Sequence, residues 1–150
     1  MSNATTDPKP PRWLKRMNKL VLAMQHLGVP AGPSQVLTVP GRKSGKPRST
    51  PMTPFDHNGA LYTVAGYPGA DWAANARAAG VGTLTRGRRA RRVRIVELSA
   101  EESRPVLRAF AVKVGVGVGF AKRSGLVVDG TPDEFEALAG RLAVFRFDPA

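Results

Sequence analysis

Apolar residues recur with two different periods along the chain, and the two periods predict different elements. Between Arg12 and Leu27 they fall at helical spacing, with Lys and Arg on the opposite face. This pattern predicts a basic amphipathic helix, which would either pack on the core, cover an acceptor site or contact a membrane surface. The preceding residues 1–11 are polar and proline-rich, which predicts a flexible tail.

The middle of the chain has the shorter period of β-strands. Residues 35–39, 48–55 and 60–65 are predicted strands, and the turn residues Asn58 and Gly59 predict a hairpin between the second and the third. The second strand contains two prolines, which place it at a sheet edge or a bulge because proline cannot donate a ladder hydrogen bond.

Helices and strands alternate in the second half. An Ala-rich helix is predicted over 71–79, with Asp71 as N-cap and Gly80 as C-terminal stop. Residues 81–85 and 91–98 predict a hairpin whose tip reads RGRRARR.

Two capping boxes, Ser99 with Glu102 and Thr131 with Glu134, predict two further helices before a last strand at 142–147. About six strands in antiparallel hairpins, without a βαβ rhythm, predict an α+β barrel-like fold with peripheral helices. No linker divides the chain, so residues 12–150 are predicted to form one domain.

Composition narrows the classes of function. Apolar residues make up 42% of the 150, no apolar run reaches the ~18 residues of a membrane span, and the N-terminus lacks a secretory pattern. We therefore expect a cytoplasmic protein, associated with a membrane only if the first helix binds one.

The absence of cysteine removes disulfides and Cys-based zinc sites, and two distant histidines give little basis for a metal. The net charge of +12 would attract nucleic acid, anionic lipid or a phosphorylated cofactor.

The stretch GRKSGKPRSTP, residues 41–51, is the most distinctive in the chain. It does not have Walker A spacing, and GVGVG at 115–119 lacks the third glycine of a dinucleotide motif, so the latter is interpreted as a flexible connection or a point of close packing. His26 and His57 belong to no catalytic motif. The basic stretch is either a solvated turn or a loop that presents backbone N–H groups and cations to one anion. The second interpretation fits a protein that uses the chemistry of an anionic cofactor.

These residues resemble the signature of the deazaflavin-dependent nitroreductase and quinone reductase family. The similarity extends over residues 37–98 and more weakly to the end, and it includes the pair Trp72 and Asn75. It implies a split β-barrel like that of FMN-binding proteins, and coenzyme F420, a deazaflavin with a phosphodiester and an oligoglutamate tail. The implied reaction is hydride transfer from reduced F420 to a small-molecule electron acceptor: a quinone, an enone or a nitro-compound.

The resemblance also implies three groups of cofactor-binding residues. The phosphate and tail would be received by Arg42, Lys43, Ser44 and Arg48. The ring would pass the backbone of Ser49, Thr50 and Pro51. The ring border and the pocket behind it would be formed by Ala65, Gly66, Tyr67, Trp72 and Asn75. Tyr67 is the candidate catalytic hydroxyl.

Two features distinguish this chain from its relatives. Many relatives have Ser-Lys-Gly-Gly where residues 66–69 read GYPG, so one polar and one basic contact are missing. Relatives that act on bulky nitro-compounds have tyrosines in the C-terminal half, and this chain has none there, which favours a quinone or enone. An apolar acceptor pocket, or ordinary core, would be formed by Met17, Leu20, Phe110, Val114 and Phe120.

Two alternatives are retained. The same barrel could bind FMN, whose phosphate would also suit the basic loop. A module for nucleic acid or anionic lipid could use the arginine-rich hairpin and the first helix. The hairpin lacks aromatic residues for base stacking, which disfavours nucleic acid, and its charges would also suit a solvated edge.

Overall fold

The computed structural model describes residues 34–150. The predicted tail 1–11 and helix 12–27, with its membrane contact, lie outside the described residues. The strands are β1 Gln35–Pro40, β2 Pro47–Met52, β3 Phe55–His57, β4 Ala60–Val64, β5 Val81–Arg86, β6 Arg89–Glu97 and β7 Val144–Pro149. The helices are α2 Asp71–Ala79, α3 Ala100–Lys113, α4 Gly115–Arg123 and α5 Pro132–Glu136.

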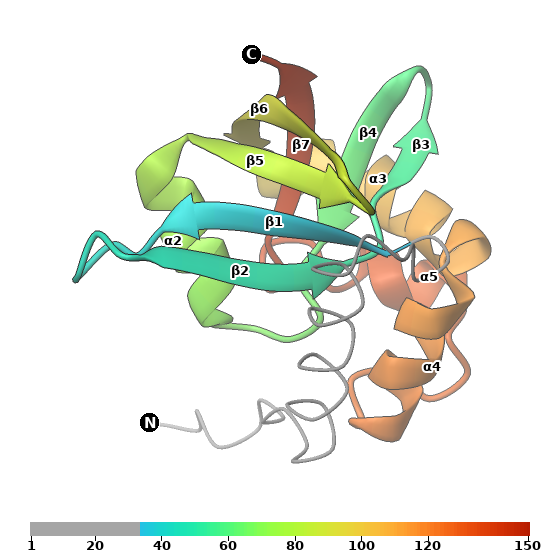
Figure 1. Ribbon diagram of the computed structural model, residues 1–150. Helices are drawn as coiled ribbons and strands as arrows, with labels where there is room; N and C mark the ends of the chain where they lie inside the picture. The colour runs from blue at the N-terminus through green and yellow to red at the C-terminus, as the bar shows by residue number, and fades with distance from the viewer. Residues whose placement is uncertain (1–33) are drawn as a thin grey trace.

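The seven strands form one antiparallel sheet in the order β2-β1-β5-β6-β7-β4-β3. Strands β2 and β3 are the two edges, yet only Thr53 and Pro54 separate them in the chain. Three Cα steps span at most about 11 Å, whereas the edges of a flat seven-stranded sheet would lie about 28 Å apart. The sheet must therefore curl into a half-barrel, as Figure 1 shows.

This arrangement corrects one predicted strand and confirms a hairpin. Residues 48–55 are two strands on opposite edges, because the chain leaves the sheet at Thr53 and Pro54. The described residues thus contain seven strands, where about six were predicted. The predicted edge position of the prolines is confirmed for β2. The hairpin at Asn58 and Gly59 is also confirmed, with positive φ angles of 50° and 82°.

Two apolar clusters pack against the sheet. One contains Leu37, Leu84 and Phe145 and is closed by the alanines of α2. The other joins Phe110 and Phe135, from α3 and α5, to residues of β3, β4 and β7. In Figure 1, α3, α4 and α5 lie together beside the β3–β4 end of the sheet, while α2 lies by the other end.

The helix boundaries confirm most of the capping predictions. Both capping boxes are present, and Gly80 ends α2 with φ 71°. The N-cap of α2 is Ala70, so the assignment of Asp71 was wrong; Asp71 is the first helical residue, and its carboxylate lies 3.4 Å from Arg42. The last strand begins at Val144 rather than at residue 142.

The GVGVG segment begins helix α4, so the interpretation as a flexible connection was wrong. The alternative of close packing is confirmed at Gly117, where a Cβ would overlap the ring of Phe110. Glycine at this position lets α4 approach α3 closely and brings Phe120 toward the sheet.

Candidate functional site

The basic loop between β1 and β2 is a closed, hydrogen-bonded turn. Gly41 N donates to Lys46 O at 2.8 Å, and Gly45 N donates to Gly41 O at 2.9 Å. Gly45 has φ 74°, a conformation that favours glycine. Ser44 Oγ accepts from Lys46 N at 3.2 Å. The loop thus has a defined shape.

Helix α2 anchors this loop through Arg42. Asn75 Oδ1 accepts from the Arg42 backbone N at 3.1 Å and from its Nη1 at 2.8 Å. Arg42 Nη2 lies 3.4 Å from Asp71 Oδ1. Asn75 is only 8% exposed, so a single buried amide oxygen fixes both the backbone and the side chain of Arg42. Arg42 therefore positions the loop as well as contributing charge.

The remaining cations of the loop face outward. Lys43, Lys46 and Arg48 are exposed, and none of them pairs with a carboxylate of the described residues. The side chain of Arg48 lies over Gly41, where a Cβ would stand 3.3 Å from Arg48 Cγ. Glycine at 41 therefore leaves room for the Arg48 side chain to lie along the loop.

A cationic pocket of about 610 Å³ lies between the loop and α2. It brings together eight of the residues predicted to bind the cofactor: Arg42, Lys43, Ser44, Arg48, Ser49, Thr50, Trp72 and Asn75. Asp71 adds one carboxylate at its edge.

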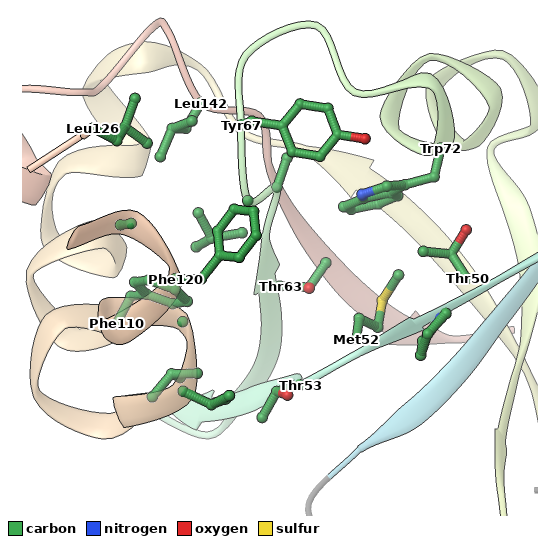
Figure 2. A pocket seen from close by; sticks show the side chains of 18 of the residues that line it. Thr50, Met52, Thr53, Thr63, Tyr67, Trp72, Phe110, Phe120, Leu126 and Leu142 are labelled. Atoms are coloured by element: carbon green, nitrogen blue, oxygen red, sulfur yellow. The ribbon is translucent and has the colours of Figure 1, made fainter. Parts of the chain in front are cut away.

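An apolar cavity of about 400 Å³ adjoins this pocket, and the two share Thr50, Asp71 and Trp72. Figure 2 shows Trp72 and Thr50 on one side of the cavity and Phe110 and Phe120 on the other. The other predicted residues that line it are Pro51, Ala65, Gly66, Tyr67 and Val114. The Trp72 ring also packs on Phe145, with centroids 5.6 Å apart, so the residue between the two pockets is held by the core.

Tyr67 lines the apolar cavity and is half-buried. Burial, and then the charge of Asp71, raise the pKa of its hydroxyl above the ordinary value of 10.0. The hydroxyl therefore keeps its proton at neutral pH and can donate a hydrogen bond. Figure 2 shows it directed toward the side of Trp72.

Sequence reasoning missed several residues of the cavity. Met52 and Thr53 come from the end of β2, and Thr63 is an inward-facing residue of β4 that is 1% exposed. Figure 2 shows Thr63 among Met52, Phe120 and Trp72. A threonine inside a predicted strand looks like any β-former, so no sequence signal distinguished it.

The predicted acceptor pocket is partly present. Phe110, Val114 and Phe120 line the cavity, and the first two are also buried in the core. A Cβ on Gly66 would lie 3.4 Å from Phe120, so the glycine lets the ring approach β4. Met17 and Leu20 lie outside the described residues.

Within residues 34–150 there is no group of side chains that could hold a metal ion. His57 packs edge-on against Tyr62, with ring centroids 6.1 Å apart. Over the same range, no helix has the length and hydropathy needed to span a bilayer.

A single antiparallel sheet curled into a half-barrel, with helices at its sides, is the architecture of the split β-barrel fold. An FMN-binding protein related to pyridoxamine 5′-phosphate oxidase, from Nostoc punctiforme PCC 73102, has this fold; it has 10% identity and a TM-score of 0.50, with 94% of this chain and 82% of that chain covered. A chain solved as a domain-swapped dimer has 21% identity and a TM-score of 0.51, with 93% and 100% covered. The predicted split β-barrel is confirmed.

Residues 12–125 match the model of the F420H(2)-dependent quinone reductase family, and the chain belongs to that family. It is an F420-dependent oxidoreductase. An F420-H2 dependent reductase is also among the similar structures, with 22% identity, a TM-score of 0.47, and 78% and 95% of the two chains covered. No functionally curated protein matches the chain.

The residues present fit this coenzyme. A polyanionic tail needs several cations with free N–H groups. The cationic pocket offers Lys43 and Arg48, on a turn that Asn75 of α2 holds in place. A planar ring needs an adjoining apolar cavity, and this one opens from the same pocket.

Proposed function

We propose that this F420H2-dependent reductase uses a quinone or enone as acceptor, and that the acceptor occupies the cavity between Trp72 and Phe120. The observation that carries the proposal is the junction of the two pockets at Thr50, Asp71 and Trp72. A ligand anchored by its anionic tail would reach the apolar cavity only past this junction.

The loop residues would bind the coenzyme. Lys43 and Arg48 would contact the phosphate and the tail, while Arg42, fixed by Asn75, would keep the loop in shape. Reduced F420 supplies a hydride from C5 when bound. Thr50 and Pro51, at the inner end of β2, would direct the ring into the cavity.

The cavity residues would orient the acceptor and exclude water. Phe110, Val114 and Phe120 provide an apolar wall, which suits an uncharged ring. Tyr67 would donate a hydrogen bond to the acceptor oxygen that gains negative charge as the hydride arrives. Tyr67 is the only tyrosine lining the cavity in the described part of the chain, so the cavity lacks the further tyrosines that accompany action on bulky nitro-compounds in relatives.

The test compares acceptors at fixed F420H2. We expect kcat/KM to be higher for an alkyl-substituted benzoquinone than for a nitroimidazole of similar size. Tyr67→Phe should lower kcat for the quinone by roughly 10- to 150-fold, the scale of a hydrogen bond to a charged group, with F420 affinity unchanged. Preference for the nitro-compound would contradict the acceptor class, and unchanged kcat in Tyr67→Phe would contradict the role of the hydroxyl.

A further inference from the structure

The β5–β6 hairpin carries a charged surface that the site does not use. Residues 86–94, here called the arginine hairpin, contain six arginines: Arg86, Arg88, Arg89, Arg91, Arg92 and Arg94. All six are exposed.

These arginines differ from most of those elsewhere in the described residues. Five arginines outside the hairpin lie 2.5–3.9 Å from a carboxylate: Arg42, Arg77, Arg104, Arg108 and Arg146. Within residues 34–150, no carboxylate pairs with Arg86, Arg88, Arg89 or Arg91. Arg92 donates to the neutral hydroxyl of Thr83 at 3.3 Å. Arg94 is opposite Asp148 in the sheet, and its charge acts on that carboxylate. For the other hairpin arginines no described carboxylate relieves the mutual repulsion, and an anionic partner would relieve it.

The strand register places the tip of the arginine hairpin at one end of the barrel. At this same end, residues of β2 line the apolar cavity. Strand β1 pairs Gln35 with Met52 on one side and Val36 with Thr85 on the other. Arg86 follows Thr85 and so lies level with Gln35 and Met52. Met52 lines the cavity, and Figure 1 shows the ends of β5 and β2 beside the start of β1.

We propose that the arginine hairpin docks the protein on an anionic lipid surface, with the cavity end of the barrel toward the bilayer. This proposal rests on the proposed function, because an apolar quinone partitions into lipid and would enter the cavity from there. Residues 81–98 contain no aromatic side chain, so the hairpin lacks an aromatic platform for stacking nucleic-acid bases, which favours lipid over nucleic acid as the anionic partner. Each arginine near an anionic surface contributes about 1 kcal/mol, so the hairpin alone could hold the protein there.

The test measures co-sedimentation with vesicles of phosphatidylcholine and phosphatidylglycerol, and with phosphatidylcholine alone. We expect binding to the anionic vesicles only, weakening as salt rises. A hairpin variant, Arg86→Gln, Arg88→Gln and Arg89→Gln together, should lose roughly a hundredfold in vesicle partitioning. A control variant with the same loss of charge, Arg104→Gln, Lys113→Gln and Lys122→Gln, should lose less than threefold.

Equal losses in the two variants would show that net charge, not the hairpin, drives binding, and would overturn the proposal. Unchanged binding of the hairpin variant would also overturn it, by assigning the contact to another segment. Tighter binding to duplex DNA than to anionic vesicles at 150 mM salt would indicate a nucleic-acid partner instead.

Activity separates this proposal from the proposed function. The hairpin variant should reduce a water-soluble benzoquinone as the native protein does, and should lose activity only toward a long-chain quinone embedded in anionic vesicles. If the native protein reduces no quinone, the proposed acceptor is wrong, while vesicle binding still tests the docking surface independently.

Discussion

Two basic segments of the same molecule differ in how their arginines are held. In the loop between β1 and β2, Arg42 is fixed by Asn75 and Asp71, and the turn closes on itself through Gly41 and Gly45. In the arginine hairpin, the side chains of four of the six arginines (Arg86, Arg88, Arg89 and Arg91) have neither a hydrogen bond nor an ion pair among the described residues. The loop therefore has a fixed shape, whereas the hairpin is a surface of exposed arginine side chains, which we propose suits a diffuse anionic partner. Charge density alone does not distinguish these two segments, but the anchoring of Arg42 and the hydrogen-bonded closure of the loop backbone do.

The largest expected effect is that of Arg48→Ala on coenzyme binding. Loss of a hydrogen bond to a charged group should weaken F420 affinity by about 1.5–3 kcal/mol, or roughly 10- to 150-fold. Arg88→Ala in the hairpin is the matched control and should change F420 affinity less than twofold. Fluorescence titration of F420 measures both. Equal losses would mean that the two segments do not differ as described.

The second prediction concerns the anchor of the loop. Asn75→Ala removes the oxygen that accepts from both Arg42 N and Nη1, so we expect a loss of about 1–3 kcal/mol in the free energy of unfolding. F420 should also bind about tenfold more weakly, because the loop loses its shape. Asn75→Asp keeps an acceptor oxygen and should retain more of both properties. Native F420 affinity in a folded Asn75→Ala protein would show that the anchor is not needed.

The third prediction tests the wall of the apolar cavity. Gly117→Ala would drive a methyl group into Phe110 and should cost about 1–3 kcal/mol of stability. Gly115→Ala has open space around its Cβ and should be neutral or slightly stabilising. Urea unfolding of the two variants gives the comparison, and similar values for both would contradict the close packing of α4 on α3.

The smallest expected effect is a pH dependence of the free energy of unfolding that comes from the Glu134 carboxylate. Glu134 accepts hydrogen bonds from four backbone N–H groups, of Val128, Asp129, Gly130 and Thr131, and these lower the pKa of its carboxyl to about 2. A lowered folded-state pKa adds stability at pH values above the ordinary 4.5, and this stability is lost as pH falls toward 2. The stability difference between native and Glu134→Gln proteins should therefore shrink over that range. A constant difference in urea midpoint would contradict the fixation of this carboxylate.

Local structure could be predicted from the sequence because it depends on near neighbours. The Asn58–Gly59 turn, both capping boxes and the β5–β6 hairpin need only residues a few positions apart. The position of β2 and β3 on opposite edges could not be predicted, because it depends on strand pairings distant in sequence. The helical state of GVGVG likewise depends on the packing of Gly117 against Phe110.

The candidate site shows the same limit. The family signature identified the loop cations, and the structure brings them together with Trp72 and Asn75. The signature did not indicate that Arg42 would donate hydrogen bonds to Asn75, since this requires Asn75 of α2 to face the loop. Thr63 was missed because its burial beside the cavity depends on the curl of the sheet.

The most direct test of the account is a comparison of F420 with the same deazaflavin riboside lacking the phosphate and the glutamate tail. We expect the native protein to bind F420 at least tenfold more tightly than the riboside, and Arg48→Ala to reduce this ratio toward one, because the tail would be bound in the cationic pocket. Equal affinities of the native protein for the two compounds would contradict the assignment of the loop as the tail site.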